Sequence, residues 1–155
     1  MEIYRIMGDK LKMEEYYSFT QSQKARFAYK ALQFIYVNIE SMQIKKSLEN
    51  VIQLCDDFYT KNSNVADELY ETLDNEEDGF TIIQECEGNE DIQLILDCII
   101  DSIAIITKEV YDNIGQKYYP EPIELVTQET YIHLLNSLQK CYGEESISKI
   151  VNICN

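Results

Sequence analysis

Apolar residues recur every three or four positions along most of the chain, which is the spacing of helices with one buried face. The first such stretch follows Thr20-Gln21-Ser22-Gln23, which has the form of a capping box, and continues to Ile39. A second stretch runs from Ile44 to Tyr59 after a short polar connection. The pattern predicts two antiparallel helices.

Two shorter apolar stretches follow, and the clearest helix comes after them. Asn64 is placed to cap a helix that runs to Leu73, and residues 80–86 predict another short helix. Residues 90–114 carry a broad apolar face, and Gly115 stands where a left-handed C-terminal cap belongs. This long helix is expected to form the centre of the core.

The C-terminal third begins with the most conspicuous loop signal in the chain. Pro120 and Pro122 lie in residues 117–123, and each proline disfavours helical geometry in the residue before it. This segment is expected to be the main ordered loop. Thr127 is placed to cap a further helix, and Gly143 separates it from a last apolar stripe that ends at Cys154.

These elements predict an all-α fold, a single compact bundle-like domain of about six to seven helices covering residues 1–155. The chain contains only 5 glycines and 2 prolines, which argues against a turn-rich all-β protein. Residues 1–16 fit the scheme least well. They are either an extra helical turn or an N-terminal extension ahead of the domain, and the pattern leaves both open.

The net charge excludes a general nucleic-acid binder. Acidic residues number 28 and basic residues 13, so the net charge is −15 with histidine neutral, which is the wrong sign for binding phosphate.

The cysteines and the absence of targeting signals indicate the compartment. Five widely spaced cysteines form neither a disulfide framework nor a zinc motif, and most occupy core positions of the apolar stripes. With no signal peptide and no apolar run long enough to cross a bilayer, we expect a cytoplasmic protein with no membrane partner.

The acidic segment 74–85 is similar in pattern to a calcium-binding loop. The segment Asp74-x-Glu76-x-Asp78-Gly79-x5-Glu85 reproduces much of the EF-hand formula. However, Glu76 is long for its position, and Ile82 stands where a polar or water-bridging residue is expected. A calcium-responsive binding module using loop 74–85 is therefore the alternative function, and the simpler interpretation is a helix-to-helix turn in which Gly79 has a positive φ.

No catalytic centre is apparent. Asp97 and Asp101 lie four positions apart on one helix face, but the only histidine, His133, has no Glu-x-x-His partner motif. There is no glycine-rich phosphate loop, no HExxH and no GxSxG motif. We expect neither an enzyme nor a cofactor or metal, with a helical enzyme working through Asp97 and Asp101 as the weakest hypothesis.

The negative charge is concentrated in one segment. Residues 62–107 contain 13 acidic residues and no Lys or Arg, so the local field is not cancelled. Such a surface suits a basic partner, and tyrosines are favoured anchors at interfaces. The expected partner-binding residues are Asp67, Glu68, Tyr70, Glu71, Asp74, Glu76, Glu77, Asp78, Tyr118 and Tyr119.

Four blocks of sequence resemble a known family. They are LDNEEDG (73–79), DCIIDSIA (97–104), TKEVY (107–111) and, most specific of all, GQKYYPEPIE (115–124). In order and spacing they are similar to the Imm-type immunity proteins of bacterial polymorphic toxin systems, family six of that naming scheme. The resemblance covers roughly residues 17–138.

This resemblance implies an all-helical cytoplasmic protein that is encoded beside a toxin, binds the cognate toxin domain and blocks it. It does not imply an enzyme. Joined to the charge distribution, it gives the leading hypothesis: an acidic face complements the basic cleft of the toxin, for which a nuclease is the natural candidate.

Overall fold

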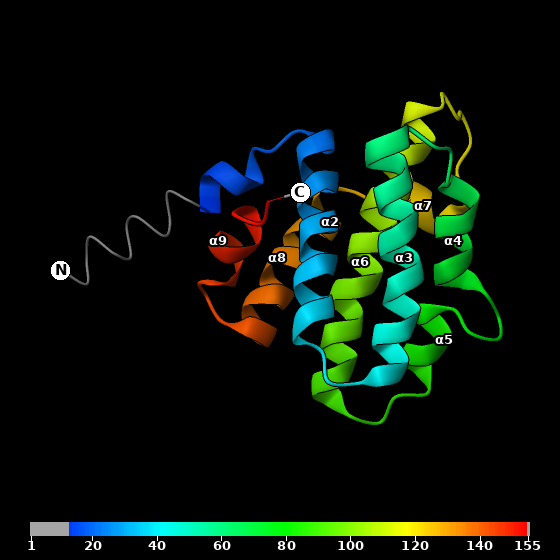
Figure 1. Cartoon of the computed structure of the whole chain (residues 1–155). Coiled ribbons are helices and arrows are strands. Elements are labelled where there is room, and N and C mark those ends of the chain that lie inside the picture. Colours follow the sequence, from blue (N-terminus) through cyan, green and yellow to red (C-terminus); the bar gives the residue numbers. More distant parts are fainter. Residues whose placement is uncertain (1–12, 155) are drawn as a thin grey trace.

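The computed structural model describes residues 13–154 and shows helices joined by short connections (Figure 1). Residues 13–17 form a helical turn. The helices that follow are α2 (Gln21–Asn38), α3 (Met42–Lys61), α4 (Ala66–Asp74), α5 (Phe80–Glu85), α6 (Glu90–Asn113), α7 (Glu121–Glu124), α8 (Gln128–Tyr142) and α9 (Ser146–Val151). The described residues contain no strand, which confirms the all-α prediction.

Helix α6 is the centre of the core. Leu96, Ile99, Ile103 and Ile106 are completely buried, and no residue from 98 to 107 is exposed. Helices α2 and α8 pack along α6, and α4, α5 and α7 pack against it as well. Its hydrophobicity explains this central position, because a helix that is apolar on nearly all sides must be enclosed by others.

The first two long helices form the predicted antiparallel pair (Figure 1). The capping box is present: the Gln23 amide donates to Thr20 Oγ1 at 3.2 Å, and the Thr20 amide donates to Gln23 Oε1 at 2.8 Å. Ser41 caps α3 in turn, since its hydroxyl oxygen accepts from the Ile44 amide. Each helix buries one apolar stripe, as the periodicity predicts.

The predicted number of six to seven helices is not matched. Among the described residues, α2, α3, α4, α6 and α8 have seven or more residues, while α5, α7 and α9 are shorter and residues 13–17 add one turn. The proline segment accounts for part of the difference. Residues 121–124 form α7 although we expected a loop, because Pro122 lies in the first turn, where the missing amide costs no intrahelical bond.

The N-terminal part of the chain is only partly described. Residues 1–12 lie outside the described part, so most of the predicted extension is not placed. Tyr16 is buried, and its carbonyl oxygen accepts from the Tyr131 hydroxyl at 3.0 Å, which holds this turn against α8.

In the described part of the chain, no helix is both long and apolar enough to span a membrane.

The cysteines are buried less uniformly than predicted. Cys55 and Cys98 are buried and Cys141 is partly buried, but Cys86 and Cys154 are exposed. The prediction of core positions is wrong for the last two. Both follow the ends of short helices, where the chain has already left the core.

Candidate protein interface

Helix α4 presents carboxylates because its apolar residues are fixed against α6. Leu69 and Leu73 are buried on one face of the helix, whereas Asp67, Glu68 and Glu71 are exposed. Asp67 and Glu68 lie in the first turn, where negative charge interacts favourably with the helix dipole. The helix therefore tolerates this density of acidic residues at its N-terminal end.

The turn after α4 continues the acidic face. Asn75 Oδ1 accepts hydrogen bonds from the amides of Glu77 at 2.8 Å and Asp78 at 3.2 Å, while its Nδ2 donates to Glu71 Oε1 at 2.8 Å. This Asx turn uses the asparagine to fold the chain back, and it leaves the side chains of Glu76, Glu77 and Asp78 exposed.

Gly79 is required by this turn for a reason other than the expected one. Its φ is −64°, so the prediction of a positive φ is wrong. Instead, a Cβ at this position would lie 2.6 Å from the carbonyl oxygens of Leu73 and Asn75. Glycine is needed because the backbone of the preceding segment approaches too closely for a side chain.

The turn gives the calcium alternative no geometric support. Within residues 13–154, no three His, Cys, Asp or Glu side chains converge in a way that could hold a metal ion. Asn75 occupies the centre of the turn with its own hydrogen bonds, and the Thr81 hydroxyl donates to the Leu73 carbonyl at 2.8 Å. Calcium binding by loop 74–85 stays a prediction.

A groove of about 670 Å³ lies between α3 and α4. Asp67, Glu68, Glu71 and Asp78 supply carboxylates to its lining, and Leu54 and Phe80 supply apolar surface. Ser47, Asn50, Thr72 and Asn75 complete it. The groove thus combines negative charge with an apolar contact area, which is the composition of a surface that receives a basic, partly apolar side chain.

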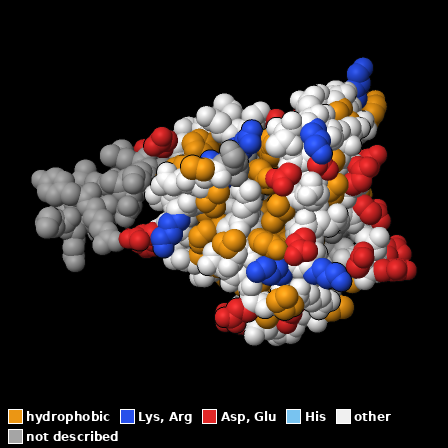
Figure 2. Space-filling model, in the orientation of Figure 1, with side chains coloured by type: hydrophobic (Ala, Val, Ile, Leu, Met, Phe, Trp, Pro, Cys, Tyr) orange, Lys and Arg blue, Asp and Glu red, His pale blue; other side chains and the backbone are white. Residues whose placement is uncertain are grey.

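Within residues 13–154, no Lys, Arg or His forms an ion pair with the carboxylates of this surface. Among the described residues, the ion pairs are Lys61 with Asp57 and His133 with Asp101, and neither involves the seven acids Asp67, Glu68, Glu71, Asp74, Glu76, Glu77 and Asp78. We call these seven residues the acidic surface. Figure 2 shows acidic side chains gathered along one edge of the molecule, where Figure 1 places α4 and its connection to α5.

The proline loop lies beside the N-terminal end of α4. Tyr111 connects them: its hydroxyl donates to Asp67 Oδ1 at 2.9 Å, and its ring contacts the Tyr119 ring edge to face at 6.0 Å. Burial first, and then the hydrogen bond to Asp67, raises the pKa of Tyr111. Tyr119 and Asp67, which are far apart in sequence, are therefore connected through Tyr111.

The three predicted tyrosines differ in availability. Tyr118 is 85% exposed, whereas Tyr70 and Tyr119 are partly buried. The Tyr70 hydroxyl donates to Asp74 Oδ2 at 3.0 Å, and the Tyr119 hydroxyl donates to Asp112. Tyr118 is thus the tyrosine of this set with a free ring surface to offer.

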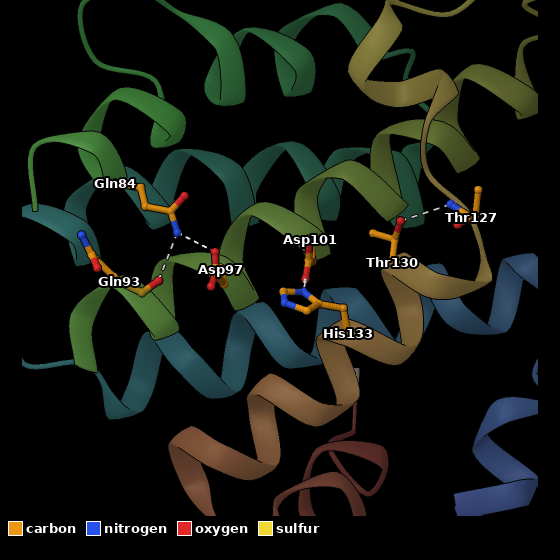
Figure 3. Close-up of polar contacts among 7 residues, drawn as sticks. All are labelled: Gln84, Gln93, Asp97, Asp101, Thr127, Thr130 and His133. Atoms are coloured by element: carbon orange, nitrogen blue, oxygen red, sulfur yellow. Dashed lines mark hydrogen bonds and ion pairs between the residues drawn. The ribbon is translucent and has the colours of Figure 1, made fainter. Parts of the chain in front are cut away.

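A second polar cluster joins α6 to α5 and α8 (Figure 3). Asp101 Oδ2 lies 2.5 Å from His133 Nδ1 of α8, and Gln84 of α5 donates to Asp97 Oδ1 at 2.6 Å. Sequence reasoning missed these pairings, because nothing local connects His133 with a carboxylate 32 residues away. The two aspartates thus tie α5 and α8 to α6.

The pKa of Asp101 is changed by its surroundings. Burial raises its pKa from the ordinary value of 3.8 to about 6, and the hydrogen bond and charge of His133 oppose that rise. A buried acid beside a histidine is also the chemistry of a proton-transfer pair. The described residues contain no metal-binding cluster at this pair.

The sequence matches a family model over most of its length. The model is described as immunity protein Imm6, and the match covers residues 14–141. The chain belongs to the Imm6 immunity protein family. No curated protein and no solved structure matched it.

The Imm6 match includes α2 to α6, α7 and nearly all of α8, so the whole acidic surface and the proline loop lie within it. This confirms the resemblance drawn from the four sequence blocks. An immunity protein acts on a toxin, so membership implies a toxin partner, and proteins of this kind are generally not enzymes. The contribution of α3 to the groove was not foreseen, since Asn50 and Leu54 carry no signal of their own.

Proposed function

We propose that this Imm6 protein binds its cognate toxin domain in the cytoplasm and neutralises it, with the acidic surface and the α3–α4 groove as the contact site. The observation that carries the proposal is the groove, which is lined by Leu54, Phe80 and four carboxylates that form no ion pair with any residue from 13 to 154. Family membership supports the toxin as the partner.

The charge distribution supports a basic toxin. Exposed carboxylates repel one another, and a basic partner removes this repulsion when it binds. A toxin that cleaves nucleic acid needs a positively charged cleft, because phosphate is its substrate. Carboxylates placed at the spacing of phosphates occupy such a cleft and block it, so a nuclease is the toxin class that we propose.

The groove gives the contact its shape. A Lys or Arg side chain of the toxin would lay its alkyl stem along the partly exposed Leu54, since Phe80 is only 2% exposed, and present its charged end to Glu68 and Glu71. Tyr118 would add an exposed aromatic ring at the neighbouring proline loop. Binding of this kind is stoichiometric, so the toxin is blocked without any reaction.

The test is charge reversal in the acidic turn. Glu76, Glu77 and Asp78 are changed together to Lys, and binding of the toxin domain encoded beside this gene is measured by calorimetry at moderate salt. We expect the dissociation constant to rise by about a hundredfold or more, because attraction becomes repulsion. Toxin activity measured in parallel is expected to reappear.

The matched control changes Glu14, Glu40 and Glu144 to Lys, three exposed acids outside the acidic surface, so that the net charge changes equally. We expect this variant to bind within about threefold of the unchanged protein. Full binding by both triple variants would refute the acidic surface as the site while leaving the immunity role. No binding of the toxin domain by the unchanged protein would refute the proposed function.

A milder pair of substitutions tests the groove itself. Glu68→Gln with Glu71→Gln removes two charges and keeps the acceptor that Asn75 uses, so the turn is preserved. We expect binding weakened by about tenfold, against no change for Glu14→Gln with Glu144→Gln. Equal affinity of the two double variants would place the contact outside the groove.

A further inference from the structure

A small pocket lies on another part of the molecule, between α2, α6 and the start of α8. Its volume is about 130 Å³, and it shares no lining residue with the α3–α4 groove. Two lysines, Lys24 and Lys108, line it together with Gln21, Thr127 and Gln128. No carboxylate lines the pocket, although the chain carries 28 acidic residues.

The two lysines are partly buried and lack anionic partners. Lys24 Nζ donates to Gln128 Oε1 and lies 5.3 Å from the centre of the Tyr131 ring, and Lys108 Nζ donates to the Val126 carbonyl at 2.8 Å. Among the described residues, neither lysine forms an ion pair. An ammonium group has three donors, so each lysine retains donors for a further acceptor.

The protein backbone adds to this positive charge. Thr127 is the N-cap of α8, a helix of 15 residues, and the pocket lies at this end. The capping box of this helix already uses two amides, since Thr127 N donates to Thr130 Oγ1 at 3.1 Å and Glu129 N donates to Thr127 Oγ1 at 3.2 Å. The contribution of this end is therefore the positive potential of the helix dipole, which favours a nearby anion. Two uncompensated ammonium groups and a helix N-terminus therefore act in the same small space.

The size and the apolar lining restrict the ligand. A volume of about 130 Å³ corresponds to roughly four water molecules, which suits a group of four or five heavy atoms. Ile105, Val126 and Tyr131 are buried and offer an apolar wall. We propose that the pocket binds a single carboxylate on a short alkyl stem, held by Lys24, Lys108 and the start of α8.

Such a carboxylate has two sources, an Asp or Glu side chain of a bound protein or a free small carboxylate. The primary test uses sodium propionate as the probe and follows the backbone amides of the full chain by NMR, with sodium chloride at equal ionic strength as the reference. We expect saturable shifts at Thr127 and Gln128. Shifts that do not saturate, or that chloride reproduces, would overturn the proposal.

Variants then locate the binding. We expect Lys24→Met and Lys108→Met, which keep the alkyl stems, to weaken propionate binding by about tenfold or more, because each removes a charged donor. The control Lys46→Met removes one exposed lysine from α3 and is expected to change binding less than about twofold. Unchanged binding in both pocket variants would overturn the site. If Lys24→Met does not fold, Lys24→Gln replaces it.

A second experiment determines whether the carboxylate belongs to the toxin or is a free molecule, and its interpretation rests on the proposed function. If the carboxylate belongs to the toxin, Lys108→Met weakens toxin binding by about tenfold and Lys46→Met does not. Equal toxin affinity of the two variants, with propionate binding still lost in Lys108→Met, assigns the site to a free carboxylate. If the toxin domain does not bind the unchanged protein at all, the proposed function fails, and the propionate titration still decides the pocket.

Discussion

Single residues show where local sequence is informative and where it is not. Thr20 and Gln23 were identifiable as a capping box because both partners lie within four positions of each other. Gly115 was identifiable as a left-handed cap because it directly follows the apolar pattern of the long helix, and its φ is 75°. The reason for glycine at position 79 was predicted wrongly. Position 79 requires glycine because the folded turn brings backbone carbonyl groups too close for a side chain.

Replacing Gly79 by Ala is expected to lower the free energy of unfolding by about 1–3 kcal/mol, because the new methyl group would overlap backbone oxygens that cannot move independently. Urea denaturation measures the change. Gly88→Ala is the matched control, since a Cβ at Gly88 meets nothing within 4 Å and its φ is not positive. Equal stability of the two variants would show that the turn adapts without cost.

The buried carboxyl of Asp101 predicts a pH dependence. Because its pKa is raised from 3.8 to about 6 on folding, the folded state binds more protons than the unfolded state between these values. Asp101 therefore makes the protein less stable as the pH rises through this range. In Asp101→Asn this contribution is absent, and the variant should gain up to about 3 kcal/mol relative to the unchanged protein between pH 4 and 7.

Urea denaturation of the two proteins across this pH range measures the difference, since the contributions of groups that do not contact Asp101 largely cancel, and the difference belongs to the Asp101–His133 pair. A companion variant checks the cause. His133 lowers the pKa of Asp101, so His133→Ala should extend the loss of stability to higher pH. A difference curve that is flat from pH 4 to 7 would show that Asp101 ionises alike in the folded and unfolded chains.

At the level of elements, the sequence was most informative about long helices. The 24 residues of α6 were predicted to within one residue, because a broad apolar face and Gly115 agree. The cap by Asn89, which accepts from the amides of Asp91 and Ile92, was not foreseen. The short helix α7 was missed, since its proline pair is compatible with either a loop or a first helical turn. Which helices meet at the groove depends on packing between α3 and α4, which no local pattern records.

Helix α4 is held at its N-terminal end by the hydrogen bond from Tyr111 to Asp67. We expect Tyr111→Phe to lower the free energy of unfolding by about 1 kcal/mol and to speed amide hydrogen exchange in α4, because this bond to α6 is lost. Tyr118→Phe, at a ring that is 85% exposed, is the control and should change neither quantity. Unchanged exchange in Tyr111→Phe would mean that packing of Leu69 and Leu73 alone fixes the helix.

For the whole molecule, the location of charge matters more than its total. Residues 62–107 hold 13 of the 28 acidic residues and none of the Lys and Arg residues. Four of these acids line the groove, and acidic side chains gather along the edge of the molecule where α4 lies (Figure 2). The sequence alone predicted this acidic segment. The sequence also grouped Tyr118 and Tyr119 with these acids, but it could not show the contacts of Tyr111 with Asp67 and Tyr119, which connect the proline loop to the start of α4.

The association rate with the toxin should reveal which property steers the encounter. Salt screens exposed charges over about 8 Å at 0.15 M, so raising sodium chloride from 0.05 to 0.5 M should slow association by about tenfold or more and leave dissociation nearly unchanged. Stopped-flow fluorescence measures both rates. If the acidic surface does the steering, the Lys variant of Glu76, Glu77 and Asp78 loses most of this salt dependence, while the Lys variant of Glu14, Glu40 and Glu144 keeps it. Since both variants change the net charge equally, an equal loss in the two would show that total charge steers the encounter, and the acidic surface would then have no special part in it.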